Sequence, residues 1–308
     1  MTLAVILTIA SLVVPSALTG DLGNYLERSA DAQFSGEQLV TCETPDGPRD
    51  SIFEMAQDHG SVVAWSSDPG RPLATAAPGM AATISGDKIE AAAVEGTTSQ
   101  DGSPLYEVGD RSDLTYLGRP AVQVSVSRKD VERARLTVDT ETRALVRVTT
   151  LTEDGSVYCD RRMVAFQPGP SPLPASAPTL DVEKTPPLDR APSQLPAAME
   201  GFRLLDTYPL QEGTLSYYSD GFFSLGVAVT DGPVGFADDA EVVDVAAGTG
   251  TYQRSFEAGR VTVTWEAGGV YLTVIGDMPP DLLDSVLKFL PTPVRHGFLG
   301  RIWSRLFG

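Results

Sequence analysis

A proline-rich stretch in the middle of the chain constrains the fold more than any other feature of the sequence. Between residues 167 and 194, prolines recur among Ser, Ala, Asp and isolated aliphatic residues that show neither strand nor helix periodicity. Proline lacks a backbone N–H, fixes φ and forces the preceding residue into extended conformations, so this stretch favours neither a helix nor a central strand. We therefore predict an interdomain linker of interrupted polyproline II at 167–195. The alternative, a long loop packed across one domain, is uncommon in compact domains.

Two β-rich domains, at 21–166 and 196–290, are predicted on either side of this linker, because apolar alternation and turn residues resume there. The chain has 308 residues, of which 42% are hydrophobic and 7% aromatic, a composition that supports two cores without suggesting a membrane bundle. Its formal net charge of −18 argues against a nucleic-acid partner, because phosphate binding needs a clustered basic surface.

The first 20 residues contain no charged side chain, and residues 3–14 are almost entirely apolar before Pro15 interrupts the run. This is the pattern of a signal-peptide core followed by small residues, although the usual basic start is missing. An uncleaved membrane anchor is the alternative, and the apolar run is short for one. We therefore expect an exported protein, in the periplasm or on the extracytoplasmic face of the cell membrane.

The first domain is predicted to begin with one helix and to continue as strands. The helix would start at Asp21, a candidate N-cap, and end at Gly36. Its apolar stripe would consist of Leu22, Tyr25, Leu26, Ser29, Ala30 and Phe34. Short extended runs separated by Gly, Pro and Asp follow, and they predict an antiparallel meander. The clearest part is a three-stranded meander at 133–163, with turns at 139–142 and 153–155.

The chain has two cysteines, Cys42 on the first predicted strand of this domain and Cys159 on the last. In an exported protein, a disulfide is the default expectation for such a pair. Two separate buried thiols are the alternative. A redox-active role is disfavoured, because the sequence has no Cys-x-x-Cys motif that would lower a thiol pKa.

The sequence contains no motif typical of a catalytic site. His59 and His296 are too few and too far apart for a metal-ligand set, and no Gly-x-Ser-x-Gly elbow or phosphate loop occurs. Gly248-Thr249-Gly250 begins a dinucleotide-like pattern, but its third glycine is absent, so we interpret it as a turn. We expect no catalytic residues, no metal and no cofactor, and therefore a protein that is not an enzyme.

The second domain is predicted to be a small antiparallel sheet with one covering helix. Asp220-Gly221 stands between two alternating runs, which predicts a β-hairpin because positive φ costs little there. Alternation at 260–266 and 270–276 predicts another. Pro279 and Pro280 suit the first turn of the helix, and its apolar stripe ends before Pro291.

Several segments carry a family resemblance. The stretch RARLTVDTETRALVR resembles a strand-turn-strand of the lipoprotein-carrier superfamily. In the second domain, four segments in this order resemble the C-terminal domain of the MucB/RseB family of extracytoplasmic sigma-factor regulators: LPAAMEGFRLL, YYSDGFFSLGVAV, AGTGTYQRS and VYLTVIGDMPPDLLDSVLKFL. The resemblance covers nearly the whole chain from Tyr25 to Leu290.

This resemblance implies an α+β fold, in which an N-terminal open antiparallel β half-barrel wraps a helix and a proline-rich linker leads to the small C-terminal sheet. It also implies an exported negative regulator that binds the extracytoplasmic segment of a membrane anti-sigma factor, shields it from proteolysis and senses a lipid. A lipid or lipoprotein carrier is the alternative function. A carrier needs no second domain, whereas a regulator needs a protein-binding surface outside the barrel.

Candidate lipid-binding residues are Phe53, Met55, Val63 and Trp65. Phe53 and Met55 share one face of their predicted strand, as do Val63 and Trp65 on theirs. They are therefore predicted to line the concave side of the half-barrel for an acyl chain, with an ordinary packed core as the alternative.

Candidate partner-binding residues are Tyr217, Tyr218, Phe222 and Phe223, which surround the predicted Asp220-Gly221 hairpin. Consecutive residues on a strand point to opposite sides, so one aromatic of each pair should remain outside the core. An exposed aromatic beside a hairpin is a good anchor for a protein partner. Burial by the linker or by the C-terminal tail is the alternative.

The tail, residues 291–308, is predicted to be basic and amphipathic. Its apolar helical face would consist of Phe298, Leu299, Ile302, Trp303, Leu306 and Phe307. Arg301 and Arg305 would point away from that face. Such an element should become ordered only when docked, either on the protein itself or on an anionic membrane surface.

Overall fold

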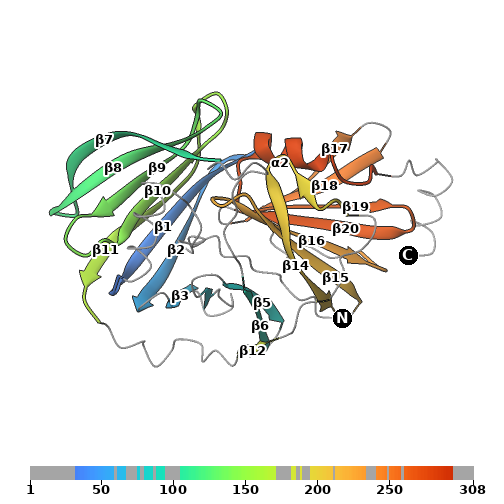
Figure 1. Ribbon diagram of the computed structural model, residues 1–308, viewed down its shortest axis with the longest axis horizontal. Helices are drawn as coiled ribbons and strands as arrows, with labels where there is room; N and C mark the ends of the chain where they lie inside the picture. Colours follow the sequence, from blue (N-terminus) through green and yellow to red (C-terminus); the bar gives the residue numbers. More distant parts are fainter. Residues whose placement is uncertain are drawn as a thin grey trace.

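The computed structural model contains two large antiparallel β-sheets that meet end to side, with one described helix, α2, next to the junction (Figure 1). It describes residues 32–58, 61–66, 75–76, 80–85, 88–93, 105–170, 182–184, 188, 195–210, 212–233, 241–247, 250–257 and 260–293. The expected signal segment, most of the expected first helix and most of the basic tail lie outside these residues. Within the described parts, no helix is long and apolar enough to span a bilayer.

The sheet of the N-terminal domain has nine strands in the order β4-β3-β2-β1-β11-β10-β9-β8-β7. It is open, and all of its neighbouring strands are antiparallel. The strands are β1 (Phe34–Thr44), β2 (Gly47–Asp58), β3 (Ser61–Ser66), β4 (Thr75–Ala76), β7 (Glu107–Tyr116), β8 (Arg119–Arg128), β9 (Val131–Asp139), β10 (Leu145–Leu151) and β11 (Val157–Pro168). The predicted meander is confirmed as β9, β10 and β11.

One end of this sheet, which we call the far end, curls toward itself. The Tyr116 hydroxyl on β7 donates to the Met163 carbonyl on β11 at 2.8 Å, although three strands lie between β7 and β11 in the sheet order. Tyr116 and Phe166 pack against a buried cluster that includes Phe34 and Met55. Curvature therefore gives the far end a small core of its own.

A cation and a carboxylate complete the far end. Arg119 donates from Nε to Asp139 Oδ2 at 2.7 Å and stands over the Phe166 ring at 5.7 Å. Asp139 also accepts from the Thr142 backbone N–H at 2.7 Å, which closes the turn between β9 and β10. These contacts lower the pKa of Asp139, against the opposite effect of its burial.

One sequence expectation for this region is wrong. Phe34 was predicted to lie in the first helix, but β1 begins at Phe34 and pairs with both β2 and β11. Phe34 is 1% exposed and stacks at 5.3 Å on Phe166. Because an aromatic residue packs equally well on a strand, its helical spacing from Ala30 carried no information.

A three-stranded sheet joins the linker to the N-terminal domain. Its order is β12-β6-β5, with β5 (Met80–Ser85), β6 (Lys88–Ala93) and β12 (Val182–Lys184). β12 lies within the predicted linker and pairs in parallel with β6. The linker is therefore not polyproline II throughout, and its proline-free Val182–Lys184 forms an edge strand. Further on, Leu188 donates its N–H to the Thr207 carbonyl at 2.6 Å.

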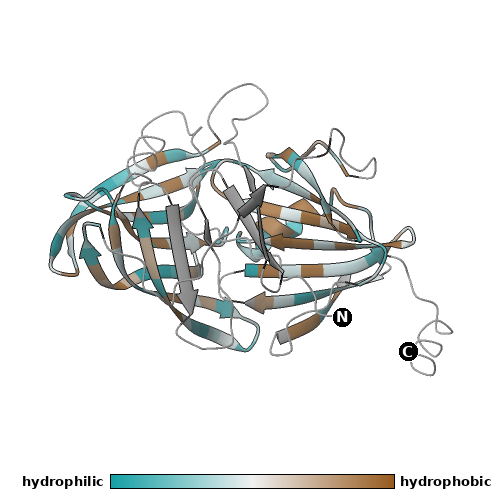
Figure 2. Cartoon of the chain, turned by 90° about the horizontal axis from the view of Figure 1, so that it is seen from below, coloured by the Kyte–Doolittle hydropathy of each residue, from teal (hydrophilic) through white to brown (hydrophobic). Residues whose placement is uncertain are grey.

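The C-terminal domain has one eight-stranded antiparallel sheet in the order β13-β14-β15-β16-β20-β19-β18-β17. Hydrophobic segments, brown in Figure 2, recur on the strands of this sheet. The strands are β13 (Ala198–Met199), β14 (Phe202–Leu210), β15 (Gly213–Ser219), β16 (Ser224–Thr230), β17 (Glu241–Ala247), β18 (Gly250–Glu257), β19 (Arg260–Ala267) and β20 (Val270–Gly276).

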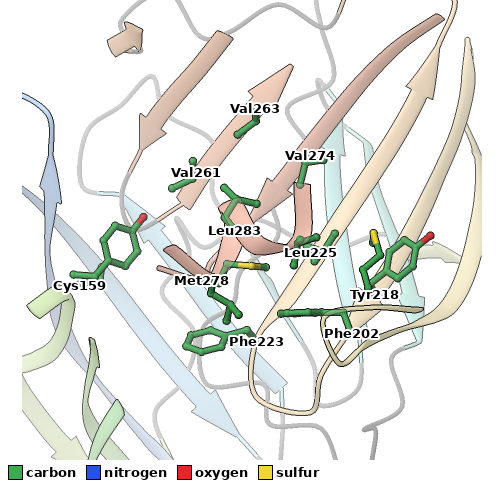
Figure 3. Close-up of a cluster of buried hydrophobic side chains, with 14 of the residues drawn as sticks. Cys159, Phe202, Tyr218, Phe223, Leu225, Val261, Val263, Val274, Met278 and Leu283 are labelled. Carbon is green, nitrogen blue, oxygen red and sulfur yellow. The ribbon is translucent and has the colours of Figure 1, made fainter. Parts of the chain in front are cut away.

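Helix α2 (Pro280–Leu287) covers one face of this sheet, as predicted. Proline occupies its first turn, and the helix buries Leu282, Leu283, Val286 and Leu287. These leucines belong to a core that also contains Phe223 and Met278 and that reaches Cys159 of the N-terminal domain (Figure 3). The predicted antiparallel sheet with a covering helix is confirmed, and the hydrophobic core is continuous between the two domains.

Candidate functional site

The two domains meet at the end of the nine-stranded sheet opposite the far end, which we call the near end. It presents the start of β7, the turn between β8 and β9, and the start of β11. The facing surface of the C-terminal domain consists of the β13–β14 turn, the β15–β16 loop and the start of α2 (Figure 1). The interdomain contact comprises Tyr106, Arg128, Lys129 and Arg133 on one side and Glu200, Asp220, Phe222 and Asp281 on the other.

Asp220 is the centre of this contact and is fully buried. Its Oδ2 accepts from the Tyr106 hydroxyl at 2.5 Å and from Arg128 Nη1 at 3.3 Å. Its Oδ1 accepts from the backbone N–H groups of Phe222 at 3.0 Å and Phe223 at 2.8 Å. The Asp220 carboxylate thus stabilises its own loop through Oδ1 and binds the N-terminal domain through Oδ2. Burial raises the pKa of Asp220, while Arg128 and the Tyr106 hydroxyl oppose the rise.

The two hydrogen bonds from the loop change an expectation about this hairpin. Phe222 and Phe223 were predicted to lie on a strand, with one aromatic on each side. Instead β15 ends at Ser219 and β16 begins at Ser224, so both aromatics lie in the loop. Strand alternation does not apply there, and both rings pack near Tyr106, at 5.2 Å for Phe222 and 6.3 Å for Phe223.

Arg128 connects Asp220 to a second turn of the C-terminal domain. Its Nη2 donates to the Glu200 carbonyl, and its guanidinium stands over the rings of Tyr106 at 5.9 Å and Phe202 at 6.0 Å. A Cβ added to Gly201, whose φ is +84°, would lie 2.5 Å from Arg128 Nη2. The turn therefore needs glycine at this position for two reasons, its conformation and the approach of the arginine.

Two further ion pairs flank this centre. Lys129 Nζ donates to Glu200 Oε1 at 2.9 Å, and 75% of the lysine side chain is exposed. Arg133 Nη1 donates to Asp281 Oδ2 at 2.5 Å, with only 10% of the arginine side chain exposed. The exposed pair contributes little to stability, whereas removing one partner of the Arg133–Asp281 pair costs more, because the arginine is largely shielded from water.

A second buried acid lies behind Asp220. Asp277 follows β20, is 5% exposed, and accepts from the Ser224 N–H at 3.0 Å. Burial raises the pKa of Asp277 to about 6, and the positive charge of Arg161 on β11 opposes the rise. The pKa of this carboxyl group is therefore higher than that of an exposed aspartate.

The aromatic residues predicted to bind a partner are brought together only in part. Tyr217 is 7% exposed, Tyr218 is 0% exposed and Phe223 is 2% exposed. The Tyr218 hydroxyl donates to the Pro196 carbonyl at 2.8 Å, so Tyr218 holds the linker end rather than a free surface. Phe222 alone is partly exposed, at the rim of the interdomain contact.

The residues predicted to bind lipid do not form one row. In the pairing of β2 with β3, Phe53 stands opposite Ser66 and Met55 opposite Ala64, whereas Val63 and Trp65 stand opposite Ala56 and Glu54. Met55 is 1% exposed in the far-end core, and Phe53 packs against the main core. The side chains of Val63 and Trp65 lie outside what the structure describes.

Cys42 and Cys159 form a disulfide. They stand directly opposite each other on β1 and β11, the first and last strands of the N-terminal sheet in sequence, as expected. Both are buried at the near end, within the core that continues into the C-terminal domain. Within the described ranges, no three His, Cys, Asp or Glu side chains gather as a metal site would require.

Sequence reasoning missed Tyr106, Arg128 and Asp277. Arg128 precedes Lys129 and Asp130, two residues of positive φ, so in the sequence it is one more charged residue beside a turn. Its partner Asp220 is 92 positions away. The only available signal was Asp-Gly at the hairpin, which marks a turn and says nothing about what its carboxylate contacts.

Three solved structures are similar to most of the chain. MucB in complex with MucA(peri) has 21% sequence identity and a TM-score of 0.52, covering 89% of this chain and 99% of that chain. The Pseudomonas aeruginosa MucA/MucB complex has 17% identity, a TM-score of 0.51 and the same coverage of 89% and 99%. MucB alone has 17% identity and a TM-score of 0.54, covering 88% and 98%.

No family model and no curated protein sequence matches the chain. At such low sequence identities the likeness establishes the fold. The expected resemblance to the MucB/RseB family is thus confirmed at the level of fold, over 88–89% of this chain.

Proposed function

We propose that this protein is an exported negative regulator that binds the extracytoplasmic segment of a membrane anti-sigma factor and shields that segment from proteolysis. One observation carries the proposal: the similarity covers 99% of a MucB chain that was solved in complex with MucA(peri). A carrier would need only the N-terminal half, whereas the similarity to MucB covers 89% of this chain.

The surface around Phe222 is our candidate for partner binding. Phe222 is the one partly exposed member of the four predicted aromatics, and it packs on Tyr106 at 5.2 Å at the boundary of the two domains. Aromatic residues at the centre of an interface carry a large share of the binding energy. Phe223 packs against Phe222 in the same loop at 4.8 Å, whereas Tyr217 and Tyr218 are buried on β15.

A lipid ligand for the N-terminal domain is the second candidate function. Phe53 and Met55 lie on the apolar side of β2, which also carries the buried cores of that domain. If the protein is a lipid carrier, the purified protein should contain an acyl lipid and should bind no anti-sigma segment. The basic tail would add contact with an anionic membrane surface in either case.

Affinity capture distinguishes these functions. The full chain is expressed with an affinity tag and exported. It is then crosslinked reversibly to neighbouring proteins in the cell envelope and purified. The crosslinked partners are identified by mass spectrometry. We expect a membrane-anchored anti-sigma factor, crosslinked through its extracytoplasmic segment. Recovery of lipoproteins or lipid without such a protein would support the carrier instead.

Protection from proteolysis is tested on the same pair. The extracytoplasmic segment is incubated with a protease in the presence and absence of the regulator. We expect cleavage to slow in proportion to the bound fraction. If the bound segment is cleaved as fast as the free segment, the protein binds the segment but does not shield it from proteolysis.

A further inference from the structure

Strand β7 forms one edge of the nine-stranded sheet and is the longest edge strand of the described sheets (Figure 1). It has 10 residues, whereas the other edge strands, β4, β5, β12, β13 and β17, have between two and seven. Within the described parts of the chain, β7 pairs with β8 and with no strand on its other side. Such an edge presents a row of backbone N–H and C=O groups to which an extended segment can pair.

Both faces of β7 are open to solvent along the middle of the strand. The five consecutive residues from Gly109 to Asp113 are all exposed, so neither side of the strand is covered there. The neighbouring strand β8 differs, because its Val122, Val124 and Val126 are at most 2% exposed. A segment can therefore reach the edge of β7 without displacing a core residue.

The charge of β7 determines which kind of segment can pair with it. The strand carries Glu107, Asp110 and Asp113 against one cation, Arg111, which lies 3.7 Å from Asp113. Two copies of the protein that paired through β7 would bring these carboxylates together, within chains of net charge −18. Like charges across such a contact are unfavourable. The edge therefore disfavours a second copy of this chain and favours a segment that carries Lys or Arg.

The start of β7 lies at the junction of the two domains, beside the residue that we assign to partner binding. Tyr106 immediately precedes β7, donates to Asp220 at 2.5 Å and packs on Phe222 at 5.2 Å. A strand of this length extends over about 34 Å, at about 3.4 Å per residue. One extended segment of about ten residues along β7 would therefore begin beside Phe222 and end near Tyr116 at the far end.

We propose that the extracytoplasmic anti-sigma segment binds as an added strand on β7, with basic residues next to Glu107, Asp110 and Asp113 and an apolar residue on Phe222. The inference rests on the proposed function, because it takes the anti-sigma segment as the partner. It adds the conformation and the charge of that segment. In this binding mode, backbone pairing provides affinity, and the side chains along the edge provide specificity.

Hydrogen–deuterium exchange of the full chain, with and without the extracytoplasmic segment of the captured anti-sigma factor, tests the added strand. The β7 amides that point away from β8 should gain at least about tenfold protection in the complex, because they become hydrogen-bonded. The amides of β17, an edge strand of the other sheet, should not change. If the segment binds but β7 exchanges as in the free protein, the inference is overturned and the proposed function stands.

Two further outcomes would also overturn the inference. Protection of β7 in the free protein that rises with protein concentration would identify a second copy as the occupant of the edge. If the segment does not bind the folded wild-type protein in titration calorimetry, the proposed function fails and the added strand fails with it.

A charge reversal on the edge tests whether the segment is basic. Asp110→Lys places a cation on the exposed part of β7 and should weaken binding about five- to tenfold at low salt, with a smaller effect at high salt. The matched control is Asp244→Lys, which makes the same change at an exposed position on β17 and should keep the wild-type affinity. Because both positions are exposed, neither change alters a core. Equal affinities of the two variants would overturn the inference.

Discussion

The two ends of the nine-stranded sheet are built from the same four kinds of side chain. The far end uses Tyr116, Arg119, Asp139 and Phe166, all from the N-terminal domain. The near end uses Tyr106 and Arg128 from that domain, with Asp220 and Phe222 from the other. The far-end arginine side chain is 24% exposed, whereas the near-end arginine side chain is 4% exposed.

The two ends differ in the exposure of their arginine and in whether the contacting residues come from one domain or from both. These differences determine what the contacts stabilise. At the far end the pair closes a turn and water still reaches the cation, so the contacts stabilise one domain locally. At the near end water is excluded and each charge depends on a partner from the other domain. The same kinds of side chain therefore stabilise a single domain at the far end and connect the two domains at the near end.

The largest difference between the ends is expected from removing each acid. Asp220→Ala should lower the free energy of unfolding by about 3–5 kcal/mol, because Arg128 is left buried without its counter-ion. Asp139→Ala should cost less, about 1–3 kcal/mol, since it removes hydrogen bonds from a turn. Urea unfolding at neutral pH, followed by circular dichroism, measures both. Equal losses would show that the near end is no more dependent on its charge pair than the far end.

Removing each tyrosine hydroxyl sharpens the comparison. Tyr106→Phe deletes a hydrogen bond to a charged, buried carboxylate and should cost about 1.5–3 kcal/mol. Tyr116→Phe deletes one to a neutral carbonyl and should cost about 0.5–1.5 kcal/mol. Because both variants keep the ring, a difference in unfolding free energy reports the hydroxyl alone. A larger loss at Tyr116 would contradict the assignment of the near end as the stronger contact.

The smallest effect is expected at the rim of the junction. Lys129→Ala removes an ion pair with Glu200 in which the lysine is mostly exposed, so stability should change by less than about 1 kcal/mol. Any change should also disappear in high salt, which screens exposed charges. A loss of several kcal/mol would mean that the pair is buried when the protein is in solution.

Local signals in the sequence predicted much of the fold. The turns at 139–142 and 153–155, the Asp-Gly hairpin and the proline-led helix each depend on residues close together in the chain, and all are present. The pairing of Cys42 with Cys159 also followed, because the chain has no third cysteine.

The expectations that were wrong depended on contacts that leave no periodic signal in the sequence, most of them with distant strands. Phe34 has helical spacing but joins β1 because β2 and β11 provide neighbours on both sides. Val182–Lys184 became a strand because β6 offered a free edge. Phe222 and Phe223 left the strand because Asp220 accepts both of their N–H groups, which widens the hairpin loop. The partner strands β2, β11 and β6 lie outside any sequence window that periodicity can examine, whereas Asp220 is close in sequence but its side-chain contacts leave no periodic signal.

Phe222 is the residue whose substitution best tests where the anti-sigma segment binds. Phe222→Ala should weaken binding of the anti-sigma segment by at least about 2 kcal/mol, the usual scale for an anchor residue. The matched control is Ile52→Ala, which removes a large apolar side chain that is 52% exposed on β2, away from the junction. Equal affinity of the Phe222→Ala variant and the wild type would place the partner on another surface.

Titration calorimetry of the purified full chain against the extracytoplasmic segment of the captured anti-sigma factor tests the central claim most directly. We predict saturable binding with a dissociation constant of about 1 µM or lower, equivalent to about −8 kcal/mol. Absence of binding by the folded wild-type protein, together with a copurified acyl lipid in native mass spectrometry, would contradict it and favour a carrier.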